Sequence, residues 1–156
     1  MARARKETDY EIRTAFDVPL EFAFRWCTDF TTDDARYESE SYQRRILSRS
    51  PRRVVYEDLE DTGKGWVWSR HTVRLSPPYR WHSDSTGSHR EIHLDYRLTR
   101  ISDGRTRLVL TARRRPTVIG EKNPSKARWE GATRRSWAKL GRALERDFRN
   151  ARSRTK

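Results

Sequence analysis

The sequence predicts an α+β fold in which a curved antiparallel sheet of about six to seven strands wraps around one long C-terminal helix. Three observations carry this prediction. The last thirty or so residues have the period of an amphipathic helix. Most of the preceding chain consists of short runs in which apolar and polar residues alternate. A helical pattern follows only the first of these runs, so two short helices are expected after the first strand.

The first strand is expected at Tyr10–Phe16, where apolar and charged side chains alternate. Pro19 then suits the first position of a helix over Leu20–Trp26, because its φ angle is already helical and a missing N–H has no partner to lose there. The stretch Asp29–Asp34 reads as a turn into a second short helix. The chain therefore opens as a strand followed by two short helices.

Six further strand candidates follow, separated by residues that are typical of turns. They lie at Tyr42–Ser48, Arg53–Glu60, Trp66–Leu75, Tyr79–Ser85, Arg90–Ile101 and Thr106–Arg114. Their short connections, of which Ser102-Asp103-Gly104 is the clearest, favour antiparallel hairpins. In the last two strands one face is apolar and the other polar, which predicts one covered and one exposed face of the sheet. The covered set is Ile92, Leu94, Tyr96, Leu98, Leu108, Leu110 and Ala112.

The C-terminal helix has two contrasting faces. At about 100° per residue its large apolar side chains fall on one face. They are Trp129, Trp137, Leu140, Leu144 and Phe148. Four arginines, seven residues apart, follow the opposite face: Arg128, Arg135, Arg142 and Arg149. The apolar face is expected to cover the sheet, which leaves the arginines exposed.

Length and composition favour one folded domain. The 156 residues have a mean hydropathy of −1.10 but include 17 aromatic side chains, which a disordered chain would not carry. We expect one domain over residues 7–150, with basic flexible ends at 1–6 and 151–156.

Cys27 is the single cysteine, which excludes an internal disulfide, and we interpret it as a small core residue. No apolar run is long enough for a membrane span, so we expect a soluble, cytoplasmic protein.

The net charge of +13 has two interpretations. The chain contains 29 Arg and only 6 Lys, a bias that a GC-rich genome produces without selection for charge. Alternatively, the arginine stripe of the last helix, about 30 Å long, tracks phosphates of a nucleic acid or another anionic surface. The sequence leaves both interpretations open, and the second defines an alternative function as an adaptor.

The order of these elements, together with the hairpin Asp103-Gly-Arg-Thr-Arg-Leu-Val-Leu110 and the aromatic terminal helix, resembles the START-like (SRPBCC) superfamily. This is the helix-grip fold of polyketide cyclases, Bet v 1-like pathogenesis-related proteins and lipid-transfer domains. The resemblance covers Tyr10 to Arg149. It implies a cavity between sheet and helix that binds a small hydrophobic molecule, aromatic, polyketide-like or lipid in kind.

One local motif resembles a narrower group. Trp66-Val67-Trp68 is similar to the W-x-W of bacterial aromatase/cyclases, whose tryptophans line the cavity. If Trp66 and Trp68 face inward, so does Arg70, whose guanidinium would bind a carboxylate or enolate oxygen and assist a cyclase or aromatase reaction. The aromatase/cyclases carry serine and then arginine at the next two inward positions, whereas this chain carries Arg70 and then Thr72.

Two alternatives remain open for this strand. Arg70 equally suits an ion pair with Glu57 or Asp58 on a neighbouring strand. The opposite face is also apolar, with Val67, His71, Val73 and Leu75.

The candidate ligand-binding residues are Trp66, Trp68, Arg70, Trp81, Tyr96 and Trp137, with Tyr56 and Trp129 as further aromatic candidates. No catalytic set is evident, because the sequence has no nucleophile elbow and no phosphate-binding or dinucleotide-binding glycine motif. His71, His82 and His93 are expected on the face opposite the candidate ligand-binding residues, and His89 in a turn. Because no histidine spacing resembles a metal triad, we expect neither a metal nor a cofactor.

Overall fold

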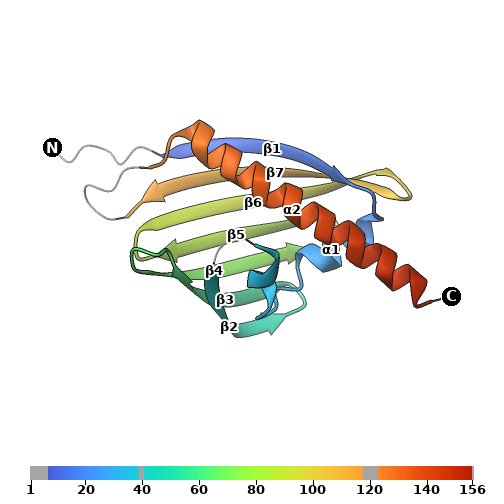
Figure 1. Cartoon of the computed structure of the whole chain (residues 1–156), viewed down its shortest axis with the longest axis horizontal. Coiled ribbons are helices and arrows are strands. Elements are labelled where there is room, and N and C mark those ends of the chain that lie inside the picture. The colour runs from blue at the N-terminus through green and yellow to red at the C-terminus, as the bar shows by residue number, and fades with distance from the viewer. Residues whose placement is uncertain (1–6, 39–40, 118–122, 156) are drawn as a thin grey trace.

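The computed structural model describes residues 7–38, 41–117 and 123–155, and it places one sheet behind one long helix (Figure 1). The elements are β1 (Thr8–Phe16), α1 (Leu20–Cys27), the 3₁₀ helix η1 (Asp34–Tyr37), β2 (Ser41–Ser50), β3 (Arg53–Asp61), β4 (Trp66–Ser76), β5 (Arg80–Gly87), β6 (Arg90–Ser102), β7 (Arg105–Pro116) and α2 (Lys126–Ser153). This order confirms the predicted fold class, including the two short helices after the first strand.

The sheet has seven strands in the order β1-β7-β6-β5-β4-β3-β2 within the described chain, and all neighbours are antiparallel. Strands β2 to β7 follow one another as hairpins, whereas β1 pairs with the last strand, β7. The segment with α1 and η1 therefore carries the chain from one edge of the sheet to the other (Figure 1). This crossing segment lies against the same face as α2.

The core lies between the sheet and the two α-helices. Phe16, Leu98, Leu108 and Leu144 are fully buried there, and they come from β1, β6, β7 and α2. The inward faces predicted for β6 and β7 are confirmed, because β7 buries Leu108, Leu110 and Ala112, and Leu94, Tyr96 and Leu98 of β6 pack in the same core clusters. Residue alternation along a strand therefore predicts the covered face correctly where only one of the two faces is apolar.

Helix α2 begins at a serine cap and crosses the covered face. The Ser125 hydroxyl accepts a hydrogen bond from the Arg128 backbone N–H at 3.2 Å. Its apolar side contacts β1 and α1, with the Phe22 and Phe148 rings 4.9 Å apart.

The helix continues to Ser153, three residues into the stretch predicted as a flexible end, whereas residues 1–6 lie outside the described part of the chain. No helix of the described residues is long and apolar enough to cross a membrane.

Small differences from the predicted elements have local causes. Pro19 occupies the position before the helix and α1 begins at Leu20, because Pro19 itself has an extended ψ of 151°. The second short helix is a single 3₁₀ turn without a side-chain cap. Strand ends differ from the predicted ones by a few residues, as is usual where ladders fray.

The two glycines of α2 test how closely the helix approaches the sheet. A Cβ atom at Gly141 would lie 3.0 Å from the Phe16 ring, whereas one at Gly131 would meet only the end of the Arg135 side chain at 3.4 Å. We expect Gly141→Leu to lower the free energy of unfolding by about 1–3 kcal/mol through overpacking. We expect Gly131→Leu to leave it unchanged or to raise it by about 0.5–1 kcal/mol, because leucine favours the helix. Urea denaturation measures both variants, and equal stabilities would contradict a tight contact at Gly141.

Candidate functional site

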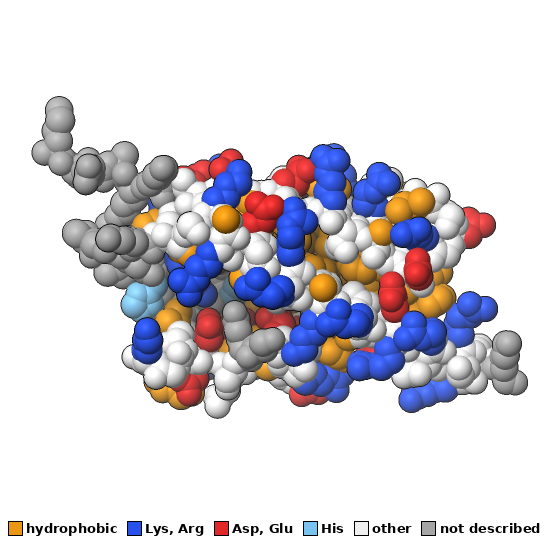
Figure 2. Space-filling view, turned by 45° about the horizontal axis from the view of Figure 1, so that its top comes forward, with side chains coloured by type: hydrophobic (Ala, Val, Ile, Leu, Met, Phe, Trp, Pro, Cys, Tyr) orange, Lys and Arg blue, Asp and Glu red, His pale blue; other side chains and the backbone are white. Residues whose placement is uncertain are grey.

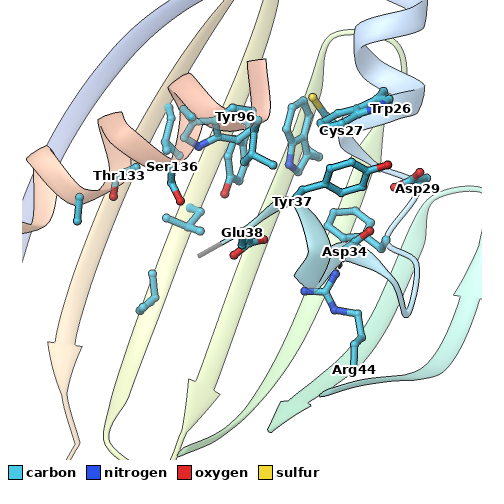
Figure 3. A pocket seen from close by; sticks show the side chains of 18 of the residues that line it. Trp26, Cys27, Asp29, Asp34, Tyr37, Glu38, Arg44, Tyr96, Thr133 and Ser136 are labelled. Atoms are coloured by element: carbon cyan, nitrogen blue, oxygen red, sulfur yellow. Dashed lines mark hydrogen bonds and ion pairs between the residues drawn. The ribbon is translucent and has the colours of Figure 1, made fainter. Parts of the chain in front are cut away.

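A cavity of about 370 Å³ lies between α2, the inner face of the sheet and the segment with α1 and η1. Strands β1, β6 and β7 and the first half of α2 bound one end, and β2, η1 and the loop after α1 bound the other (Figure 3). The two ends differ in chemistry. The first is lined mainly by aromatic and aliphatic side chains, whereas the second carries three carboxylates and one guanidinium.

The apolar end is built from stacked aromatic rings. Trp81 of β5 and Tyr96 of β6 are direct cross-strand neighbours, and their rings stack at 4.6 Å with an interplanar angle of 10°. Trp137 of α2 packs 5.9 Å from Tyr96, and Trp129 meets Tyr10 edge to face at 4.4 Å. Rings that pack on one another keep their orientation without a ligand. The cavity therefore has a wall of mutually packed aromatic rings, which suits planar apolar molecules.

The polar end is organised around Arg44, whose side chain is only 6% exposed. Its Nε and one terminal nitrogen donate to the two oxygens of Asp58 at 2.8 and 2.9 Å, and the other terminal nitrogen contacts Asp34. The guanidinium also lies over the Tyr56 ring, 4.0 Å from its centre. Burial alone would lower the pKa of Arg44, but the bonds to Asp58 raise it above its usual value, so the group stays charged. These two carboxylates take three of its five N–H donors.

Asp29, at this end of the cavity, has a raised pKa. Burial, and then repulsion by Asp34, raise its pKa from 3.8 to about 6. Two contacts hold the loop that carries it, because Arg49 donates to the backbone carbonyl oxygens of Asp29 and Phe30 at 2.6 and 2.8 Å. Phe30 itself has a φ of +43°, a left-handed conformation that few large residues adopt, and its ring stacks on Tyr56 at 5.5 Å.

His71 supports this end from within the sheet. Its ring stacks on Tyr56 at 4.5 Å with an angle of 10°, and its Nε2 lies 2.9 Å from the Ser69 hydroxyl. The prediction that His71 lies on the opposite face is wrong, since its ring is packed on the covered side of β4. Burial lowers its pKa from 6.5 to about 4, against the opposing effect of Asp58, so His71 is neutral at physiological pH.

The predicted ligand-binding residues divide into two groups. Trp81, Tyr96 and Trp137 line the cavity, as do Tyr56 and Trp129, and their ligand contacts stay a prediction. Trp66 and Trp68 lie on the outer face of the sheet, where they are 57% and 38% exposed, and they do not line the cavity. Arg70 lies beside them and donates to Glu57 at 2.7 Å, which is the alternative that the sequence left open.

The inward orientation predicted for Trp66, Trp68 and Arg70 is therefore wrong. Strand β4 turns its other set toward the core, with Val73 fully buried and Leu75 packed against the core cluster. Both faces of this strand are apolar in sequence, so the period of two defines the faces without saying which one is covered. Pairing with β3 and β5 decides it.

Sequence reasoning missed the polar end. Asp29, Asp34, Tyr37, Glu38 and Arg44 come from a loop, a 3₁₀ turn and an edge strand. One signal was present, because Arg44 alternates with the aromatic and aliphatic residues at positions 42 and 46, an arrangement that indicates an inward arginine. The carboxylates carried no such signal, since acidic residues are ordinary in turns.

The arginine stripe of α2 is exposed, as expected. Arg128, Arg135, Arg142 and Arg149 all face solvent, and basic side chains are spread over the helix-bearing side of the molecule, with acidic ones among them (Figure 2). Exposure is what an anionic partner requires, but it is equally the state of a solvated helix face. The adaptor hypothesis therefore stays a prediction.

No protein-family model matches the chain, and no curated protein matches it in sequence. Solved structures do match its fold. The Zhui aromatase/cyclase from Streptomyces sp. R1128 superposes with a TM-score of 0.71 at 15% identity, over 91% of this chain and 93% of that one. A START superfamily protein from Mycobacterium smegmatis gives 0.67 at 13%, over 92% and 98%. Ara h 8.0201 gives 0.67 at 8%, over 89% and 98%.

These likenesses establish the architecture. The chain has the START-like helix-grip fold that its sequence resembled, with a curved seven-stranded antiparallel sheet and a long C-terminal helix. Proteins of this architecture include aromatase/cyclases and START proteins.

Arg44 offers a test of the polar end. Replacing it by methionine leaves Asp34 and Asp58 without their buried cation, and we expect the free energy of unfolding to fall by about 3–5 kcal/mol. The matched control is Arg45→Met, at the next, exposed position of β2, where we expect a change within about 0.5 kcal/mol. Chemical denaturation measures both, and similar losses for the two variants would show that the Arg44 cluster contributes no more than a surface charge.

The buried state of His71 predicts a pH dependence. Since the fold lowers the pKa of His71 from 6.5 to about 4, the unfolded chain takes up this proton first. The protein should lose up to about 3 kcal/mol of stability from this group as the pH falls through that window. His71→Phe keeps a ring on Tyr56 but cannot titrate, so we expect its stability to fall less over the same range. Parallel pH profiles for the two proteins would be evidence against a buried neutral His71.

Proposed function

We propose that the protein binds a small, largely apolar molecule with an aromatic or other planar portion in the cavity between the sheet and α2. The observation that carries this proposal is the stacked pair of Trp81 and Tyr96, which forms one wall of a cavity of about 370 Å³. That volume is in the range of sites for small molecules. Support also comes from the fold, which is shared with a protein described as an aromatase/cyclase.

The polar end suggests which functional groups the ligand carries. Arg44 is already paired with Asp58 and Asp34, so a ligand carboxylate would find no unpaired guanidinium there. The carboxylates of Asp29, Asp34 and Glu38 instead offer hydrogen-bond acceptors. A ligand with hydroxyl donors, for example a phenol or a reduced polyketide, suits this end better than an anion does.

A cyclase or aromatase activity is the finer version of the same proposal. Arg70, the group that the sequence suggested for stabilising an enolate, lies outside the cavity. The residue best suited to proton transfer is Asp29, because a carboxyl group with a pKa of about 6 is partly protonated near neutral pH. We assign it the acid–base role in this version of the function.

Binding can be tested with naphthol, a neutral planar probe with one hydroxyl donor. We expect calorimetry to show saturable binding of one molecule per chain. Ser136 lines the cavity from α2, so Ser136→Trp fills it and should weaken binding at least about tenfold, which corresponds to about 1.4 kcal/mol. The neighbouring Arg135 is exposed, and the control Arg135→Trp should bind as the wild type does.

Naphthoate, the carboxylate analogue, distinguishes the two ends of the cavity. We expect it to bind more weakly than naphthol because it meets three carboxylates and a guanidinium that is already paired. Equal loss of naphthol binding in both tryptophan variants would contradict the cavity as the binding site. The adaptor hypothesis predicts a different result. Binding of a nucleic acid would then weaken steeply with added salt and would be lost when the α2 arginines are changed to glutamate.

A further inference from the structure

The outer face of the sheet carries a second cluster of functional groups, made by two copies of the pattern His-x-Asp. His82-Ser83-Asp84 lies on β5 and His93-Leu94-Asp95 lies on β6. Because the two strands are antiparallel, His82 is the cross-strand neighbour of Asp95, and Asp84 is the neighbour of His93. Both patterns point the same way out of the sheet, since their members are two residues apart. Four groups that ligate metals are thereby brought onto one patch.

Three of these groups converge on one point. His82 Nε2 lies 2.8 Å and His93 Nδ1 lies 2.6 Å from the same oxygen, Oδ1 of Asp84. One ligand atom from each residue falls within 4.8 Å of the other two. Two imidazole nitrogens and one carboxylate oxygen are a common ligand set of Zn²⁺. All three side chains are 28–38% exposed, so an ion can reach them and a water molecule can complete a tetrahedron.

Asp95, Arg80 and Arg74 surround this triad and contact its side chains or one another, as the groups that orient metal ligands do. The second ring nitrogen of His82, Nδ1, faces Asp95 Oδ1 at 3.5 Å, and Arg80 holds that carboxylate at 2.8 Å. A carboxylate behind a histidine fixes the ring and makes it a stronger ligand. Arg74 donates to Oδ2 of Asp84 at 3.0 Å, which leaves Oδ1 for the ion. The nearby arginines therefore contact carboxylate oxygens that the ion would not use.

We propose that His82, Asp84 and His93 form a Zn²⁺ site on the outer face of the sheet, with Asp95 as the residue that orients His82. The ion replaces the contacts that both histidines now make with Asp84 Oδ1. It joins β5 to β6 a few residues along the ladder from Trp81 and Tyr96, the cross-strand pair that forms the cavity wall. The metal-free expectation from the sequence overlooked this site, because the ligands are gathered by strand pairing and not by a local spacing.

The test is a Zn²⁺ titration of the full chain in competition with a chromophoric chelator at neutral pH. We expect one ion per chain, and a loss of affinity of at least about tenfold in His82→Gln and in His93→Gln. Asp95→Asn should weaken binding about 10- to 100-fold while keeping both histidines. The control is His89→Gln, which removes a histidine outside the triad and should bind Zn²⁺ as the wild type does.

A second readout reports the coordination itself. Co²⁺ in place of Zn²⁺ should give the intense visible bands of a four-coordinate site in the wild type and in His89→Gln, and these bands should be lost in the two triad variants. Circular dichroism without metal checks that each variant is folded. Equal Zn²⁺ affinity in the wild type and the triad variants, or no stoichiometric binding at all, would overturn the site. Unchanged affinity in Asp95→Asn would overturn the role of Asp95.

Discussion

The contact of α2 with β1 and α1 is the packing interaction on which the rest of the structure depends. One helix has to cover the concave face of a seven-stranded sheet, and it does so by lying close to the β1 side. There Gly141 brings the helix backbone against the Phe16 ring, and Trp26 of α1 donates to Asp147 of α2 at 3.0 Å. Since α2 is held to that side, its first half cannot also fill the space over the middle strands. The cavity is the consequence of this one-sided contact.

The two ends of the cavity follow from the topology of the chain. The apolar end is lined by β1, β7, β6 and β5 and by α2, where alternation already places aromatic side chains inward. The polar end is lined by β2 and by the crossing segment, which carries the chain from one edge of the sheet to the other and therefore contains turns, where acidic residues are ordinary. Arg44 makes this arrangement stable, because its guanidinium neutralises carboxylates that would otherwise repel one another in a half-buried place.

Strands β5 and β6 connect the two proposed sites. Trp81 and Tyr96 stack on the covered side, and the adjacent pair His82 and Asp95 faces solvent. A change in the pairing of these strands would therefore alter both the aromatic wall and the outer triad. An ion on the outer face would stiffen the two strands that carry the aromatic wall. The two proposed sites share β5 and β6 but no residues.

The sequence by itself determined the elements, the antiparallel order and the covered faces of β6, β7 and α2. In each of these elements one face is apolar and the other charged, so burial has a single solution. It did not determine the face of β4, because Trp66 and Trp68 oppose Val67 and Val73 across a strand that is apolar on both sides. Only pairing with the neighbouring strands resolved that choice.

The tertiary structure alone decided which groups meet at the polar end of the cavity and in the outer triad. Arg44, Asp34 and Asp58 come from three separate elements, and His82 and His93 from two strands, so no local spacing shows that they meet. The physical reason is that a side-chain period reports which residues share a face of one element. Which faces meet depends on strand register and helix placement, and these are properties of the whole fold.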